Sequence, residues 1–205
     1  MAARPGGAHA TAVALVRQAL ATLPAGHGPV SLRADSADYV LDLLHCCRRR
    51  GVRFAISAPR SVAMWSARGR IAPDAWHPAR DMPGAEVTET TYTPAQWRHE
   101  PLRLLIRRVR LDAAQLSRSP RARRRRTIPA EQLALALAGA VDIVYGYSFI
   151  LTDRPGPAPA AEWWQRRRAH VEERIRDEKV SVSHCAFTSS SRLEELRLFR
   201  IHVDS

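Results

Sequence analysis

Cysteine, acidic side chains and long apolar runs are all scarce in this chain of 205 residues. The three cysteines are an odd number, and Cys46 and Cys47 are adjacent, so neither a disulfide framework nor a spaced metal-binding pair is predicted. We therefore expect reduced thiols and a cytoplasmic location. No apolar run approaches a membrane span, and residues 1–7 lack the apolar centre of a signal peptide, so no membrane association is expected.

The shortage of acidic residues leaves a strongly basic chain. Lys and Arg number 32 against 20 Asp and Glu, which gives a formal net charge of +12 and an isoelectric point near 11.1. Nearly all of the cations are arginine, whose guanidinium pairs bidentately with phosphate, so a polyanionic partner is favoured. With 45% hydrophobic and 25% charged residues, the composition is that of a globular protein.

The first part of the chain predicts a βαβ unit. Residues 30–35 and 52–57 alternate as strands, with a helix between them and another at 10–23. Two strands joined in this way are expected to be parallel, with a right-handed crossover. Asp35 falls at the carboxyl end of the first strand, where open α/β sheets bind ligands, although a helix-capping role is an equally common alternative. Ser36 is predicted to cap the second helix.

Residues 59–144 are expected to be rich in β-structure, with short helices at 61–68 and 128–137. Strands are predicted at 86–92 and 102–111, and one face of the second strand carries Arg103 and Arg107. That face is either directed to a DNA backbone or is an ordinary exposed strand face. Arg107 and Arg108 are therefore candidate DNA contacts. A strand at 145–153 is predicted to return to the core, and residues 155–159 read as a linker.

The densest block of positive charge lies between Ser117 and Arg126. It ends in four consecutive arginines, namely Arg123, Arg124, Arg125 and Arg126. Because prolines flank the block, we expect an exposed loop. One interpretation is sequence-independent contact with phosphates, and the other is a disordered basic linker.

A basic helix is predicted over residues 163–179. The residues that share one of its faces are Trp164, Arg168, Val171 and Ile175. Glu172 lies on the shoulder of this stripe between Arg168 and Lys179, so we expect a half-buried, ionised carboxylate. A solvated surface helix held by local ion pairs is the alternative.

The spacing of Arg168, Glu172 and Lys179 resembles the signature around the last acidic residue of bacterial insertion-sequence transposases of the DDE type. That family normally has a tyrosine three residues before the arginine, and here the position is Gln165. Other segments resemble the same family in the same order. They are residues 32–37 with the following helix and 51–54, residues 74–76 through 89–92, residues 105–109, and the strand that ends at Thr152-Asp153.

The resemblance implies an α/β fold with a partial ribonuclease H-like mixed sheet. Residues 1–58 would form the first part of the core with the second catalytic Asp, and residues 59–144 a β-rich insertion with the basic loop. Residues 145–180 would supply the returning strand and the Glu-bearing helix. Residues 181–205 would be a divergent tail.

The resemblance also implies a site chemistry. In the family, two Asp and one Glu hold two Mg²⁺ ions that activate the attacking oxygen and stabilise the leaving oxygen. Asp35 and Glu172 match the second Asp and the Glu as catalytic and metal-binding residues, with Arg168 and Lys179 completing the signature; Mn²⁺ is a possible substitute. No residue here matches the first Asp. We therefore expect a truncated transposase that is inactive alone.

Three functions remain open from the sequence. The chain is an active nuclease or transposase completed by another chain, a catalytically inert DNA-binding protein, or a basic RNA- or ribosome-associated protein unrelated to transposition. Aromatic-rich motifs of the common RNA-binding folds are missing, which disfavours the third. DNA is the expected partner, and homo-oligomers are possible in the family.

Overall fold

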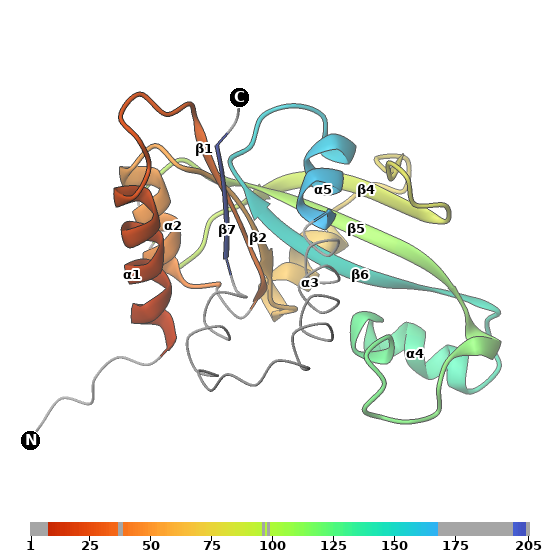
Figure 1. The fold of residues 1–205 in the computed structure, drawn as a ribbon. Helices are drawn as coiled ribbons and strands as arrows, with labels where there is room; N and C mark the ends of the chain where they lie inside the picture. The colour runs from red at the N-terminus through yellow and green to blue at the C-terminus, as the bar shows by residue number, and fades with distance from the viewer. Residues whose placement is uncertain (1–7, 37–38, 96, 98, 168–198, 204–205) are drawn as a thin grey trace, which may run out of the picture.

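The computed structural model describes residues 8–36, 39–95, 97, 99–167 and 199–203, which form a mixed α/β fold (Figure 1). Seven strands make one sheet in the order β3-β4-β5-β6-β2-β1-β7. The strands are β1 (Val30–Ala34), β2 (Arg53–Ala58), β3 (His77–Pro78), β4 (Ala85–Tyr92), β5 (Leu102–Asp112), β6 (Ile143–Thr152) and β7 (Phe199–Val203). The α-helices are α1 (Ala8–Ala21), α2 (Leu41–Arg49), α3 (Val62–Gly69), α4 (Ala130–Leu137) and α5 (Ala158–Arg166).

The predicted parallel βαβ unit is confirmed. Strands β1 and β2 are parallel, with Leu32 opposite Phe54, and α2 forms the connection. The helix begins later than expected, because its N-cap is Val40 and no side chain caps it. Ser36 is therefore not the cap; its carbonyl instead accepts from the Tyr39 amide at 3.3 Å.

Strands β4, β5 and β6 form an antiparallel meander, and β6 joins this meander to the βαβ unit. Thr152 of β6 lies opposite Arg103 of β5 on one side and opposite Ala55 of β2 on the other. The strands predicted for an insertion at 59–144 thus continue the same sheet as β1 and β2. At the far edge of the sheet, β7 pairs antiparallel with β1. Strand β7 was not predicted from the sequence.

The end of β6 is fastened to β2 by two side chains. Thr152 Oγ1 donates to the Phe54 carbonyl at 2.6 Å, and the Phe54 amide donates to Asp153 Oδ1 at 2.7 Å. Burial raises the pKa of the Asp153 carboxyl, although the hydrogen bond from the Phe54 amide opposes this shift. Asp153 therefore has a structural role, because its carboxyl joins the end of β6 to β2.

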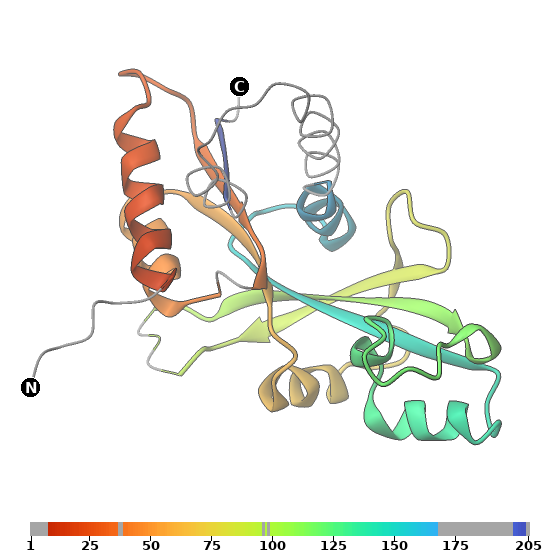
Figure 2. The same ribbon diagram turned by 60° about the horizontal axis from the view of Figure 1, so that its bottom comes forward.

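The two faces of the sheet differ in chemistry, because successive strand residues point to opposite sides. One face is apolar, and helices α1, α2 and α3 cover it (Figures 1 and 2). Its buried residues include Leu32, Phe54, Ile106 and Phe149. The opposite face contains fewer apolar residues and is covered by α5.

Cys46 and Cys47 lie in α2 beneath the apolar face and are buried and free. Burial, and then the neighbouring Cys46, raises the pKa of the Cys47 thiol, which keeps it protonated and unreactive. Among the described helices, none has the length and apolarity needed to cross a membrane.

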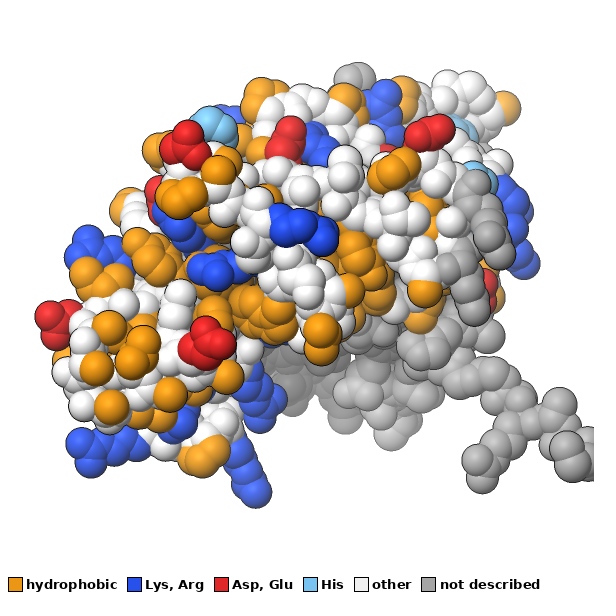
Figure 3. All heavy atoms as spheres, turned by 180° about the vertical axis from the view of Figure 1, so that it is seen from behind, with side chains coloured by type: hydrophobic (Ala, Val, Ile, Leu, Met, Phe, Trp, Pro, Cys, Tyr) orange, Lys and Arg blue, Asp and Glu red, His pale blue; other side chains and the backbone are white. Residues whose placement is uncertain are grey.

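The far end of the β5–β6 hairpin supports a small lobe formed by residues 113–142. It contains the basic loop, a 3₁₀ turn at Arg125–Thr127 and α4 (Figures 1 and 2). The lobe is attached to β6, where the Tyr145 amide donates to Gln132 Oε1 at 3.2 Å. Beside it, Thr127 packs directly on the backbone of Gly146. Seen from behind, hydrophobic and arginine side chains both gather over the lobe (Figure 3).

The close approach at Gly146 yields a test of the lobe's attachment. A Cβ at Gly146 would lie 2.6 Å from Thr127 Oγ1 and 3.1 Å from Leu111 Cδ1. We expect Gly146→Ala to lower the unfolding free energy by about 1–3 kcal/mol, as overpacked sites do. Gly69→Ala is the matched control, because a Cβ there meets no atom within 4 Å. Equal stabilities of the two variants in urea unfolding would contradict the packing.

Candidate functional site

The carboxyl ends of β1 and β2 meet a buried glutamine from α5. Gln165 is 4% exposed, and its Nε2 donates to the Ala34 carbonyl at 3.0 Å and to Ser57 Oγ at 3.5 Å. Asp35 follows Ala34 directly, is half-buried, and accepts from the Ser36 amide at 2.7 Å. The glutamine thus connects α5 to the strand end that carries the candidate catalytic aspartate.

Helix α5 begins five residues before the helix predicted at 163–179. Pro157 is the N-cap and Pro159 lies in the first turn, where a missing amide hydrogen costs no helical hydrogen bond. Part of the predicted linker is therefore helical. The residues that α5 buries are Ala158, Ala161, Glu162 and Gln165, which share one helix face. Trp164, predicted on the buried stripe, is partly buried against the same core.

A fully buried carboxylate lies between α5 and the sheet. Glu162 has 0% exposed side chain, and its Oε1 is 2.5 Å from Arg107 Nη1 of β5 and 3.1 Å from Arg166 Nε, one helical turn away. Arg107 Nη2 also donates to Ser148 Oγ at 3.4 Å. A buried carboxylate needs such pairing because desolvation of an isolated charge is costly. Glu162 therefore acts as the counter-ion of two arginines.

Arginine side chains stack on the rings of both tryptophans of α5. The ring of Trp164 is stacked by Arg33 and Arg154, whose guanidinium carbons lie 4.6 and 4.2 Å from its centroid. Arg33 Nη1 donates to the Trp164 carbonyl at 2.8 Å. On the outer side, Trp163 Nε1 donates to Asp81 Oδ2 at 2.7 Å. Cation–π contacts of this kind stabilise by about 0.5–2 kcal/mol each, so α5 is fixed in one place.

The structure places only part of the predicted catalytic set. Asp35 lies at the carboxyl end of β1, as the topology rule predicts. Arg168, Glu172 and Lys179 lie outside the described residues, as do Val171 and Ile175 of the predicted stripe. The distance between Asp35 and Glu172 is therefore not part of the described geometry.

The described donors near Asp35 do not by themselves fit a Mg²⁺ ion. Mg²⁺ requires near-octahedral oxygen ligands and usually takes one or two carboxylates. Here Glu162 is occupied by two arginines. Gln165 Oε1 is a buried oxygen without a hydrogen-bond partner among the described residues, and Asp35 is the candidate carboxylate on this side. Within the described part of the chain, no group of three or more His, Cys, Asp or Glu side chains could hold a metal ion.

The predicted strand arginines make intramolecular contacts. Arg107, with 19% of its side chain exposed, is paired with Glu162 under α5, which covers the strand face expected to be open. Arg108 points to the other face, where its Nε is 2.6 Å from Glu86 Oε2 and its guanidinium stacks 4.2 Å from the Trp76 ring. Both guanidiniums are therefore already paired with carboxylates. Their positive charges are locally neutralised, so they attract a phosphate less strongly.

The loop arginines differ from the strand arginines. Arg123, Arg124 and Arg126 are exposed, and none of them contacts a carboxylate of the described residues. Arg125 is half-buried and donates to the Arg118 carbonyl at 2.5 Å, which folds the loop back on itself. The run is thus an ordered loop on the lobe, with three of its four guanidiniums directed to solvent.

Sequence reasoning missed Glu162 and Gln165 as parts of the α5 interface. The signal was the spacing of Ala158, Ala161 and Gln165, which marks one helix face of small and polar residues. The spacing of Glu162 and Arg166, four residues apart, is a further local signal that could have indicated their pair. Nothing local indicated Arg107 as the third member, because it comes from a distant strand.

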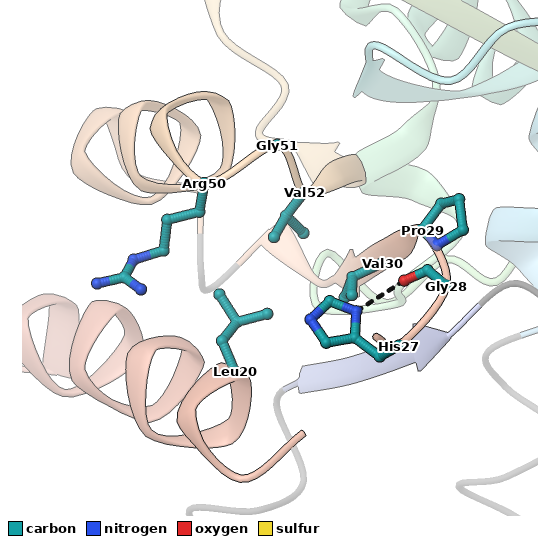
Figure 4. Close-up of a pocket in the computed structure, with 8 residues that line it drawn as sticks. All are labelled: Leu20, His27, Gly28, Pro29, Val30, Arg50, Gly51 and Val52. Atoms are coloured by element: carbon teal, nitrogen blue, oxygen red, sulfur yellow. Dashed lines mark hydrogen bonds between the residues drawn. The ribbon is translucent and has the colours of Figure 1, made fainter. Parts of the chain in front are cut away.

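The opposite ends of β1 and β2 border an open pocket of about 250 Å³ (Figure 4). It lies between the ends of α1 and α2, with Arg50 extending from α2 toward the side of Leu20. His27 Nδ1 is 2.8 Å from the Gly28 carbonyl, a contact within the pocket wall. The pocket is remote from Asp35, because it lies at the amino ends of both parallel strands.

No family model, no curated protein and no solved structure matches this chain.

The buried ion pair predicts a large effect of one substitution. Glu162→Gln keeps the shape of the side chain but leaves the Arg107 and Arg166 charges without a carboxylate. We expect the unfolding free energy to fall by about 3–5 kcal/mol, as when one partner of a buried pair is removed. Glu89→Gln is the control, since Glu89 is half-exposed where it pairs with Arg103 and should contribute less than about 1 kcal/mol. Equal losses in urea unfolding would contradict the role of Glu162.

Proposed function

We propose that this chain is a DDE-type transposase chain that binds DNA through its basic lobe and does not cut DNA on its own. The observation that supports the proposal best is the position of Asp35 at the carboxyl end of a parallel strand, beside the buried Gln165 of α5. Helix α5 is followed in the sequence by the signature residues Arg168, Glu172 and Lys179. A ribonuclease H-like sheet belongs to the same proposal.

The proposed metal chemistry depends on Glu172. Asp35 and Glu172 would hold Mg²⁺, or Mn²⁺ in its place, and the bound ion would activate or stabilise the oxygens of the phosphodiester. Asp35 has the oxygen chemistry for this ligand role. No residue matches the first Asp of the family, so the two-ion arrangement lacks its bridging ligand.

DNA binding is supported by charge. The net charge of +12 and the exposed loop arginines favour a polyanion. The buried, free Cys46 and Cys47 are compatible with a reducing compartment such as the cytoplasm, where DNA would be available. The alternative is an inert basic protein that binds RNA, which a competition with structured RNA would reveal.

The binding proposal predicts the salt dependence of affinity. Replacing Arg124 and Arg126 with glutamine should weaken binding to unrelated duplexes about equally. The slope of log K against log salt should fall by about 0.9 for each lost phosphate contact. Arg17→Gln with Arg49→Gln is the control, because both side chains are exposed on α1 and α2 and carry the same total charge. Fluorescence anisotropy with labelled duplexes measures the affinity and its salt slope. Identical slopes for the two double variants would reject the loop as a DNA contact.

The catalytic part of the proposal predicts inactivity. Loss of one metal ligand removes both metal placement and charge stabilisation, so the rate should fall by several orders of magnitude. We expect no nicking or joining of supercoiled plasmid carrying candidate element ends in Mg²⁺ or Mn²⁺. Cleavage that disappears in both Asp35→Ala and Glu172→Ala would show that the chain is a complete nuclease.

A further inference from the structure

Three consecutive residues of β6, Gly146–Ser148, hold basic parts of the chain that are distant in sequence. Gly146 contacts Thr127, which directly follows the arginine run. The Tyr147 carbonyl accepts from Arg60 Nε at 3.1 Å. Ser148 Oγ accepts from Arg107 Nη2 at 3.4 Å. The loop, the end of β2 and the middle of β5 therefore converge on one short strand segment.

The end of β2 explains why Arg60 lies there. The pairing of β2 with β6 ends at Ala58 opposite Phe149, so β6 continues toward the lobe without β2 beside it. Arg60, two residues after the strand, places its guanidinium against this continuing part of β6. Its side chain is thus directed along the sheet at the same end of the parallel strands as Asp35.

Positive charge in this cluster exceeds negative charge. Partial burial, followed by the charges of Arg123 and Arg107, lowers the pKa of Arg60. The carboxylate in contact with the cluster is Glu162, which Arg107 shares with Arg166. Within the described residues, neither Arg60 nor Arg123 contacts a carboxylate. An anion bound here would therefore relieve repulsion between like charges.

We propose that Arg60 and Arg123 together bind one backbone phosphate of duplex DNA at Gly146–Ser148, with Arg107 held behind them by Glu162. The inference rests on the proposed function and adds a specific site to it. Two guanidiniums from separate elements can each direct N–H donors to different phosphate oxygens. A phosphate bound there would lie at the sheet end that carries Asp35, whereas the exposed Arg124 and Arg126 would contact phosphates further along the duplex.

The test compares Arg60→Gln with Arg17→Gln in the full chain. Both variants lose one positive charge, but Arg17 is exposed on α1, a helix that lies away from the lobe (Figure 1). We expect Arg60→Gln to weaken binding to labelled duplex DNA about tenfold and to reduce the salt slope by about one. Arg17→Gln should change neither. Equal behaviour of the two variants would overturn the site.

A second variant distinguishes a lost phosphate contact from a folding defect. Arg123 is exposed in a loop, so Arg123→Gln should leave the thermal unfolding temperature unchanged. If both arginines bind one phosphate, the double variant Arg60→Gln with Arg123→Gln should lose less affinity than the product of the two single losses. Multiplicative losses would show two separate contacts and overturn the shared site.

Inorganic phosphate separates this inference from the proposed function. If the chain binds no duplex DNA, the proposed function fails. The phosphate site still holds if phosphate raises the unfolding temperature of the wild type and Arg17→Gln but not of Arg60→Gln. If structured RNA binds with the same dependence on Arg60, RNA replaces DNA as the ligand, and our choice of duplex DNA is wrong. An absence of any Arg60-dependent effect with DNA, RNA or phosphate overturns the site itself.

Discussion

The buried carboxylate of Glu162 is the contact on which the described site depends. Its pairing with Arg107 joins α5 to the middle of β5, and its pairing with Arg166 stabilises the last turn of the helix. Once α5 is fixed, Gln165 reaches the carbonyl beside Asp35. A hydrophobic contact would also hold a helix on a sheet, but it would not fix one helix register with the same specificity, because dispersion and burial are non-directional.

The two-faced sheet explains how one small protein keeps a stable core and a polar site. The apolar face and its three helices supply most of the buried hydrocarbon. The face under α5 can therefore carry arginines, serines and a buried glutamate, each with partners across the interface. The same arrangement concentrates positive charge where β2 ends, because Arg60 and the basic loop meet β6 beside Arg107.

Much of the secondary structure could be predicted from local pattern, since alternation and turn residues mark β1, β2, β4, β5 and β6. The parallel βαβ unit and the place of Asp35 follow from chain connectivity. The pairing of β6 with β2 and of β7 with β1 could not be predicted, because it joins segments distant in sequence. The burial of Glu162 could not be predicted from local pattern, since it depends on Arg107 of a remote strand, and the contact of Arg60 with Tyr147 has no local signal either.

In the proposed complex, the carboxyl ends of β1 and β2, with the adjoining lobe, face the nucleic acid. Hydrogen–deuterium exchange of the full chain with and without saturating duplex DNA measures this most directly. We expect slower exchange in residues 57–60, 123–127 and 145–148, with little change in the pocket residues 27–30 and 50–52 at the opposite strand ends. Protection confined to residues 27–30 and 50–52, with none at Arg60 or the loop, would contradict it.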